Sequence, residues 1–206
     1  MVTPTLAWST SYWDGEQFGS VAHQDNPLAL LPLDCFRAEF MGHPWGIPAE
    51  FLTYPPHGYT VDEALAFTLL HDVFIRPGGV GEALEKMAPI WNAYTDFRYW
   101  DAEWLPYWRN AGVVTTSPES VKVSLYSRKR EGALLVVSNL SQGAVEASAR
   151  LDLRKLGLSR GALAASDVLL KQPVAMEKGV LQLSVPRFSM RLIRVENTAS
   201  PPRVRE

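Results

Sequence analysis

The chain has 206 residues, of which 47% are hydrophobic and 20% charged, with a formal net charge of -2. This composition predicts a soluble globular protein of one large or two small domains, and it excludes a disordered or collagen-like chain. No apolar run approaches the ~20 residues that span a bilayer, so no membrane partner is expected, and a single cysteine, Cys35, excludes an internal disulfide.

The first half of the sequence predicts alternating strands and helices. Residues 5–10 (TLAWST) fit a short strand, and the polar stretch 11–26 fits a long loop. The apolar segment 28–40 predicts a helix with Pro32 near its first turn. Residues 49–56 (AEFLTYPP) then predict a buried strand that two prolines stop.

Two more helices are predicted before residue 100. A capping box at Thr60–Glu63 precedes an apolar helix whose buried face extends to Phe74. The next helix, residues 80–97, is predicted to bury Leu84, Met87 and Trp91, with a kink or restart at its internal proline.

From residue 112 the apolar pattern changes to a period of two. Six short strands separated by turns are predicted: 121–129, 133–141, 145–153, 166–171, 179–186 and 188–196. They indicate a small antiparallel β domain of the sandwich type. The last ten residues, 197–206, are predicted to be a disordered tail.

Composition supports a division into two domains. All seven Trp, six of the seven Tyr and all four His lie within residues 1–108. That half has four Lys and Arg against fourteen Asp and Glu, or -10, and the remainder has sixteen against eight, or +8. Phosphate binding needs clustered cations, whereas the cations here are spread along predicted strands, so no nucleic acid partner is expected.

The fold class predicted from these elements is α/β plus all-β. Residues 1–112 read as a partial (β/α) barrel, its carboxyl-terminal part, and residues 118–196 as a small antiparallel β-sandwich. Two or three strands cannot close an eight-stranded barrel, which takes about 250 residues on its own. We therefore expect the chain to be a fragment or a truncated relative of a barrel protein. Its unpaired strand edges are expected to pair with a missing upstream barrel segment or with a second copy in a homo-oligomer.

Several motifs resemble a known family. They are YWDGEQF, WGIPAEFLTYPP, IWNAYTDFRYWDAEWLPYWRN, VKVSLYSRK, LLVVSNLS and SVPRFSMRLIRV. Over most of residues 6–196 the chain resembles the carboxyl-terminal portion of the glycoside hydrolase family 123-like proteins. The resemblance implies a barrel glycosidase with an appended β-sandwich and a carbohydrate substrate. The amino-terminal domain and early barrel strands of that family have no counterpart here.

Asp14 and Glu16 are the candidate catalytic residues. Glycoside hydrolysis uses two carboxyl groups, or one together with a participating substrate group, to protonate the leaving oxygen and stabilise an oxocarbenium-like centre. In an extended segment residues i and i+2 point to one face, roughly 6–7 Å apart. A D-x-E sequence is also common in solvated turns and helix caps. Substrate binding therefore remains as open a role as proton transfer.

Aromatic residues near this pair are candidates for substrate binding. Sugar rings stack their C–H faces on aromatic planes, while their hydroxyls bond to carboxylates and imidazoles. The candidates are Tyr12, Trp13, Trp45, Tyr54, His57 and Tyr59. Trp13, beside Asp14, is the strongest of them. The later tryptophans, Trp91, Trp100, Trp104 and Trp108, have near-helical spacing and are predicted to be core residues, and His71 is predicted to be structural.

Other chemistries find no support in the sequence. It has no phosphate-binding glycine motif and no nucleophile elbow. His23 and Asp25 match no metal-ligand spacing, and Cys35 is predicted to be a buried, inert thiol. We therefore predict no cofactor and no metal. The predicted function is a carbohydrate-active, glycoside hydrolase-like protein, and the alternative is a non-catalytic glycan-binding or structural module.

Overall fold

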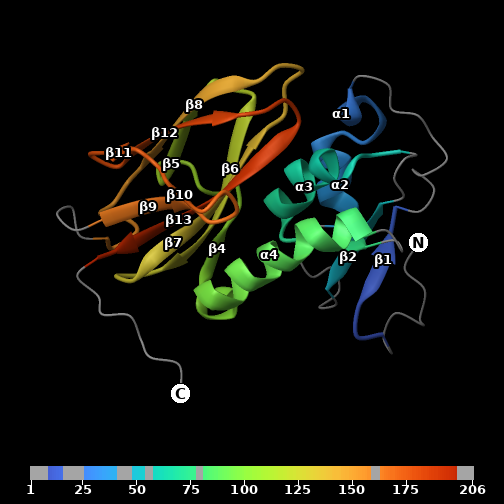
Figure 1. The fold of residues 1–206 in the computed structure, drawn as a ribbon, viewed down its shortest axis with the longest axis horizontal. Coiled ribbons are helices and arrows are strands. Elements are labelled where there is room, and N and C mark those ends of the chain that lie inside the picture. The colour runs from blue at the N-terminus through green and yellow to red at the C-terminus, as the bar shows by residue number, and fades with distance from the viewer. Residues whose placement is uncertain are drawn as a thin grey trace. The chain divides into compact units, whose positions relative to one another are not determined.

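The computed structural model describes residues 9–15, 26–40, 48–53, 58–77, 81–158 and 163–198. The chain divides into two compact units, Met1–Pro89 and Ile90–Glu206. The first unit contains parallel strands joined by helices, and the second contains two antiparallel sheets (Figure 1). The chain is therefore of mixed α/β class with mostly antiparallel sheets, as predicted at this level.

Three parallel strands form the sheet of the first unit, in the order β1 (Tyr12–Asp14), β2 (Ala49–Thr53) and β3 (Phe74–Pro77). The helices between these strands are α1 (Pro27–Leu30), α2 (Leu33–Phe40), α3 (Val61–Thr68) and the single turn η4 (Leu69–His71). Parallel strands need such crossover connections because a hairpin can join only antiparallel strands. The predicted alternation of strand and helix is confirmed for these elements.

Helices α2 and α3 cover one face of this sheet (Figure 1). The centre of the interface is aromatic: the fully buried ring of Phe51 lies 5.7 Å from Phe36, 5.5 Å from Phe40 and 5.5 Å from Phe67. Each such side chain stabilises the fold by about 1.5–3 kcal/mol when it is fully buried. This core holds β2 in place and so fixes what the opposite face of the sheet presents.

Three predicted elements of the first unit have different bounds in the structure. The helix predicted over 28–40 is split into α1 and α2 at Pro32, which cannot donate a backbone hydrogen bond. The first strand that the structure describes is β1, because residues 12–14 pair with β2. Of the predicted strand 5–10 only residues 9 and 10 are described, and neither lies in a strand. Phe74 enters β3, since the helix ends where Asp72 adopts a left-handed φ of 60°.

The long helix α4 (Gly81–Phe97) runs through Pro89 without a break. Its buried residues recur at three- and four-residue intervals: Ala83, Met87, Ile90, Tyr94 and Phe97. The prediction that Leu84 and Trp91 face the core is wrong, because they are 52% and 36% exposed. The apolar stripe of a helix can include small residues such as alanine. Because the buried stripe of α4 passes through Ala83 and not through Leu84, the face that packs on the core is rotated by one residue from the predicted one.

The second unit is built from two antiparallel sheets. The six-stranded sheet has the order β10-β9-β13-β7-β6-β4, and the four-stranded sheet the order β11-β12-β8-β5. Their strands are β4 (Glu103–Leu105), β5 (Val114–Ser117), β6 (Val121–Arg128), β7 (Gly132–Asn139), β8 (Val145–Leu151), β9 (Leu163–Asp167), β10 (Gln172–Pro173), β11 (Met176–Glu177), β12 (Val180–Val185) and β13 (Ser189–Asn197). A short helical turn, η5 (Tyr99–Asp101), precedes them.

The two sheets share one apolar core. Val123, Leu135 and Ile193 of the larger sheet and Ala147 and Leu181 of the smaller one are 0–2% exposed in a single cluster. The six predicted strands correspond to β6, β7, β8, β9, β12 and β13, whereas β4, β5, β10 and β11 were not predicted.

Strand β9 ends earlier than predicted. The carboxylate of Asp167 accepts hydrogen bonds from the backbone N–H groups of Leu169 and Leu170, which turns the chain away from the sheet. Of the predicted tail, Asn197 is the last residue of β13, and residues 199–206 lie outside the described residues.

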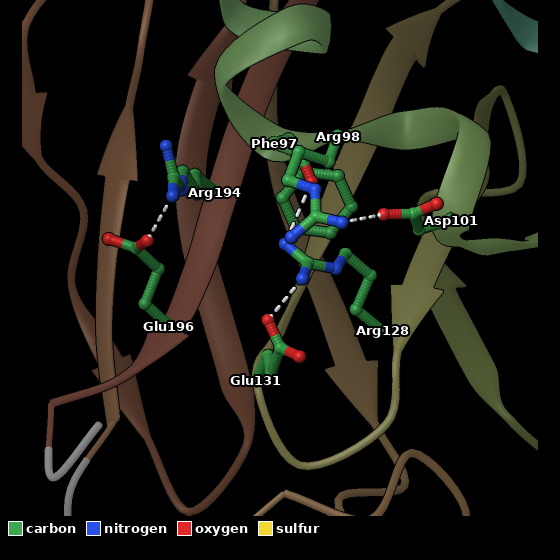
Figure 2. A network of polar contacts seen from close by, with 7 residues as sticks. All are labelled: Phe97, Arg98, Asp101, Arg128, Glu131, Arg194 and Glu196. Carbon is green, nitrogen blue, oxygen red and sulfur yellow. Dashed lines mark hydrogen bonds and ion pairs between the residues drawn. The ribbon is translucent and has the colours of Figure 1, made fainter. Parts of the chain in front are cut away.

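A polar network fixes the end of α4 to the six-stranded sheet (Figure 2). The guanidinium groups of Arg128 and Arg194 each lie 5.9 Å from the centre of the Phe97 ring. Arg128 also donates to the Phe97 carbonyl at 3.1 Å, where a cation complements the carboxyl-terminal end of the helix dipole. Both guanidiniums are neutralised by ion pairs, Arg128 with Glu131 and Arg194 with Glu196. The network therefore fixes Phe97 on β6 and β13.

Among the helices that the structure describes, none has both the length and the apolar character needed to cross a membrane.

Candidate functional site

The face of the parallel sheet opposite Phe51 carries a cluster of one aromatic and two charged side chains. Trp13 of β1 is in register with Glu50 of β2, and Arg76 of β3 is in register with Leu52. Because side chains alternate between the faces of a strand, these residues lie on the face opposite Phe51. The sheet thus buries its aromatic core on one side and presents Trp13, Glu50 and Arg76 on the other.

Arg76 connects the three residues of this cluster. Its Nη1 atom donates to Glu50 Oε2 at 3.1 Å, and its guanidinium lies 5.6 Å from the centre of the Trp13 ring. The side chains of Arg76 and Glu50 are 48% and 32% exposed, and Trp13 is 43% exposed. Exposed ion pairs and cation–π contacts each contribute only about 0–1 kcal/mol. The cluster therefore adds little to stability and leaves its groups accessible to a ligand.

This arrangement suits recognition of a sugar. An exposed indole offers an apolar plane for a ring face, a carboxylate accepts hydrogen bonds from hydroxyls, and a guanidinium donates hydrogen bonds to ring and hydroxyl oxygens. Arg76 orients the other two groups before any ligand arrives, so less conformational entropy is lost on binding.

Gly15 ends β1 in a way that no other residue could without strain. Its φ of +106° lies in the region that favours glycine, and a Cβ atom there would lie 2.9 Å from Phe51 Cε2 and 3.1 Å from the Leu52 carbonyl oxygen. The glycine of the Asp-Gly-Glu motif is therefore required by the close approach of the chain to β2.

The structure places some of the predicted site residues and does not describe others. Tyr12 is half-buried, and its hydroxyl donates to the Glu39 carbonyl at 2.7 Å. Asp14 is the last residue of β1, in register with Phe51, and its side chain is not described. Trp13 lies on the exposed face. Four predicted residues lie outside the described residues: Glu16, Trp45, Tyr54 and His57.

Tyr59 is placed in the core. It is 3% exposed, its ring packs 5.2 Å from Phe67, and its hydroxyl donates to the Pro27 carbonyl at 2.9 Å. Burial, reinforced by the charge of Glu63, raises the pKa of Tyr59 above its usual value. We correct the expectation that this ring binds substrate, because a buried ring has no face to offer a sugar.

The expectations for five further residues can be compared with the structure. His71 is fully buried, and its Nδ1 atom lies 2.6 Å from the Phe67 carbonyl oxygen, as a structural histidine requires. Cys35 is exposed on α2, so the expectation of a buried thiol is wrong. Trp100 is 59% exposed, and Trp104 and Trp108 are half-buried. The prediction that these three tryptophans are core residues is therefore wrong.

Sequence reasoning missed Glu50 and Arg76. The sequence nevertheless contained a feature that could have identified each of them. Glu50 is a charged residue within an otherwise apolar strand, and Arg76 is one of only four cations in the acidic first half. In the described part of the chain, no three His, Cys, Asp or Glu side chains come close enough together to hold a metal ion.

Residues 86–184 match the family model described as the glycoside hydrolase 123 C-terminal domain. The predicted resemblance to the carboxyl-terminal portion of that family is confirmed for these residues. A search of curated proteins gives no significant match.

Solved structures of glycoside hydrolases give partial matches of low sequence identity. α-Galactosidase I from Mortierella vinacea is 11% identical, with a TM-score of 0.49 over 74% of this chain and 41% of that one. A GH27 β-L-arabinopyranosidase from Geobacillus stearothermophilus is 13% identical, with a TM-score of 0.46 over 79% and 36%. This chain thus spans about two fifths of their length.

Proposed function

We propose that this chain, which contains a region matching the glycoside hydrolase 123 C-terminal domain, is a carbohydrate-active protein that acts on glycosidic bonds through carboxylate chemistry. In this proposal the parallel βα unit within residues 1–112 is the carboxyl-terminal part of a (β/α)8-type barrel, and the two antiparallel sheets, which include residues 118–196, are its β-sandwich. The parallel βα arrangement of β1 to β3 and the two packed antiparallel sheets support this organisation.

The observation that carries the proposal is the exposed cluster of Trp13, Glu50 and Arg76. In a (β/α) barrel the helices cover the outer face of the strands, and ligands bind at their carboxyl ends. The cluster lies on the face opposite Phe51, and the strand that contains Trp13 ends one residue later at Asp14. An aromatic plane flanked by a donor and an acceptor is the chemistry that a neutral sugar needs.

Asp14 and Glu16 remain the proposed catalytic residues, with Trp45, Tyr54 and His57 as further substrate contacts; Tyr12 is left out because it lies on the Phe51 face, opposite Trp13. The support is topological. Parallel strands end at the same edge of a sheet, so the segments that follow Asp14 in β1 and Thr53 in β2 start from one edge. β1 and β3 are the outer strands of the described sheet. We therefore expect hydrolysis to require further barrel strands, from a longer chain or from a second copy.

The test of the Trp13 site is glycan binding by the 206-residue chain. We expect Trp13→Ala to weaken binding of neutral oligosaccharides by at least ~10-fold in titration calorimetry, because a lost stacking platform costs about 1–3 kcal/mol. Trp100→Ala is the matched control, since Trp100 is a 59% exposed tryptophan outside the site and its loss should leave affinity unchanged. Equal affinities for wild type and Trp13→Ala would contradict the proposal.

The test of the catalytic pair is kinetic. In a preparation that hydrolyses aryl glycosides, we expect Glu16→Gln to lower kcat/KM by at least ~100-fold, as for the loss of a general acid or base. The control is Glu85→Gln, an exposed carboxylate on α4. A loss confined to KM would instead assign Glu16 to sugar binding.

A non-catalytic glycan-binding module is the second candidate function. It is favoured by the pairing of Glu50 with Arg76, because a carboxylate held by a guanidinium is suited to accept hydrogen bonds from sugar hydroxyls and not to donate a proton. The two functions differ in outcome: a module binds oligosaccharides through Trp13 in every preparation, and none of those preparations cleaves them.

A further inference from the structure

A concavity of about 660 Å³ opens at one end of the four-stranded sheet of the second unit. Three segments line it: the turn at Gly112 with Thr115 of β5, residues 150–153 at the end of β8, and Lys178 between β11 and β12. Its volume lies in the range of about 300–1,000 Å³ that small-molecule sites occupy. It belongs entirely to the second unit and so is distinct from the Trp13 cluster.

Hydrogen bonds hold the three segments together. The backbone N–H of Leu151 donates to the Gly179 carbonyl at 2.7 Å, and that of Asp152 donates to the Val113 carbonyl at 2.8 Å. The side chain of Lys155 donates to the Gly112 carbonyl at 2.9 Å. The walls of the concavity are therefore formed before any ligand binds, which lowers the entropic cost of binding.

The lining contains more positive than negative charge. Arg150 lies on β8, the middle strand of the site, and its guanidinium forms no ion pair or side-chain hydrogen bond with any residue that the structure describes. Among the described residues Lys178 has one loose partner, Glu177 at 3.6 Å, and both side chains are at least 86% exposed. Surface pairs of this kind contribute little and are easily exchanged for a ligand.

Asp152 supplies the single carboxylate of the lining. Its Oδ1 atom accepts the backbone N–H groups of Lys155 at 3.0 Å and Arg154 at 3.1 Å, and these hydrogen bonds hold the pKa of Asp152 below its usual value. The carboxylate is thus ionised near neutral pH and turned toward its own loop. It leaves hydrogen-bonding capacity for a neutral hydroxyl beside the two cations.

We propose that this concavity binds the carboxylate of an acidic carbohydrate, a chain of uronic acid residues, through Arg150 and Lys178. A guanidinium pairs with a carboxylate through two parallel hydrogen bonds, which gives direction as well as charge. Asp152 and Thr115 accept and donate hydrogen bonds to the hydroxyls of the same sugar. The inference rests on the proposed carbohydrate function and adds the class of ligand.

The experiment compares two ligands of the same backbone, an oligogalacturonate and its fully methyl-esterified form, in titrations with the full 206-residue chain. We expect the acidic form to bind at least ~10-fold more tightly, and this preference to disappear in Arg150→Gln and to decrease in Lys178→Ala. Lys129→Ala is the control, because Lys129 is also an exposed cation of the same unit, with a side chain 72% exposed, and does not line the concavity. Unfolding midpoints that match wild type show that each variant is folded.

The outcomes separate this inference from the proposed function. An undiminished preference for the acidic form in Arg150→Gln overturns the inference while leaving Trp13 untouched. Displacement of the oligogalacturonate by an equal concentration of inorganic sulfate also overturns it, since the site would then hold any anion. Both the Trp13 site and the Arg150 site are supported if Trp13→Ala no longer binds the methyl-esterified form but still prefers the acidic form through Arg150. If the folded wild-type chain binds neither form, both proposals fail.

Discussion

Replacing Asn139 with aspartate should destabilise the second unit by about 3–5 kcal/mol, the cost of a buried charge without a partner. Asn139 is fully buried at the end of β7. Its Nδ2 atom donates to the carbonyls of Gly143 at 2.7 Å and Pro186 at 2.9 Å, with Val185 at 3.2 Å. An aspartate keeps the shape but directs a negative oxygen at these carbonyls.

The oxygen of the Asn139 side-chain amide also forms hydrogen bonds. Asn139 Oδ1 accepts from the backbone N–H of Ser141 at 3.0 Å and from its hydroxyl at 2.7 Å. The side chain thus joins the turn after β7 to the turn between β12 and β13. This accounts in physical terms for the Asn-Leu-Ser motif that the resemblance relies on.

Urea unfolding of Asn139→Asp measures this effect against Ser141→Ala as the control. Ser141→Ala removes one partner of the network and should cost about 1 kcal/mol. Because typical domains are stable by only about 5–15 kcal/mol, the aspartate variant should show a much lower midpoint or fail to fold. An aspartate variant within about 1 kcal/mol of wild type would show that the amide network is not a major source of stability.

The first unit should lose stability as the pH falls from about 6.5 to 4, because its buried histidine must be charged on unfolding. Burial is the main cause that lowers the pKa of His71, to about 4; the charge of Arg37 also lowers it, while the Phe67 carbonyl and Asp34 act in the opposite direction. An unfolded histidine has a pKa near 6.5, so the unfolded state takes up a proton first. Stability is therefore full above about pH 6.5 and is lost progressively down to about pH 4.

The expected loss is about 3 kcal/mol, since each unit of pKa difference corresponds to 1.36 kcal/mol. His71→Gln is the informative variant: it retains an N–H donor for the Phe67 carbonyl but cannot titrate. We expect it to be somewhat less stable than wild type at pH 7.5 and to show a shallower dependence on pH between 6.5 and 4. Carboxylates titrate equally in both proteins, so identical slopes would exclude His71 as the cause.

Local signals in the sequence predicted local structure well. The capping box is present as predicted: Thr60 Oγ1 accepts from the Glu63 N–H at 3.2 Å, and Glu63 Oε2 accepts from the Thr60 N–H at 3.0 Å. The main strands of the second unit follow from the two-residue period. Each of these features depends on residues within a few positions of one another.

Features that depend on distant pairing were missed. Glu50 and Arg76 are 26 residues apart, and only the register of β2 and β3 brings them together. The short strands β10 and β11 exist because a neighbouring strand supplies hydrogen bonds, and two residues carry no periodicity. The candidate site is therefore predicted only at Trp13, whose signal is its aromatic ring beside a carboxylate in the sequence.

The central claim is that Trp13 is the sugar-contacting residue of a carbohydrate-active protein, and fluorine NMR tests it most directly. The chain is labelled with 5-fluorotryptophan, the seven resonances are assigned by single Trp→Phe variants, and neutral oligosaccharides are titrated in. We expect the Trp13 resonance to shift saturably while those of Trp91 and Trp100 stay in place. A folded chain in which no sugar moves the Trp13 resonance would contradict the account.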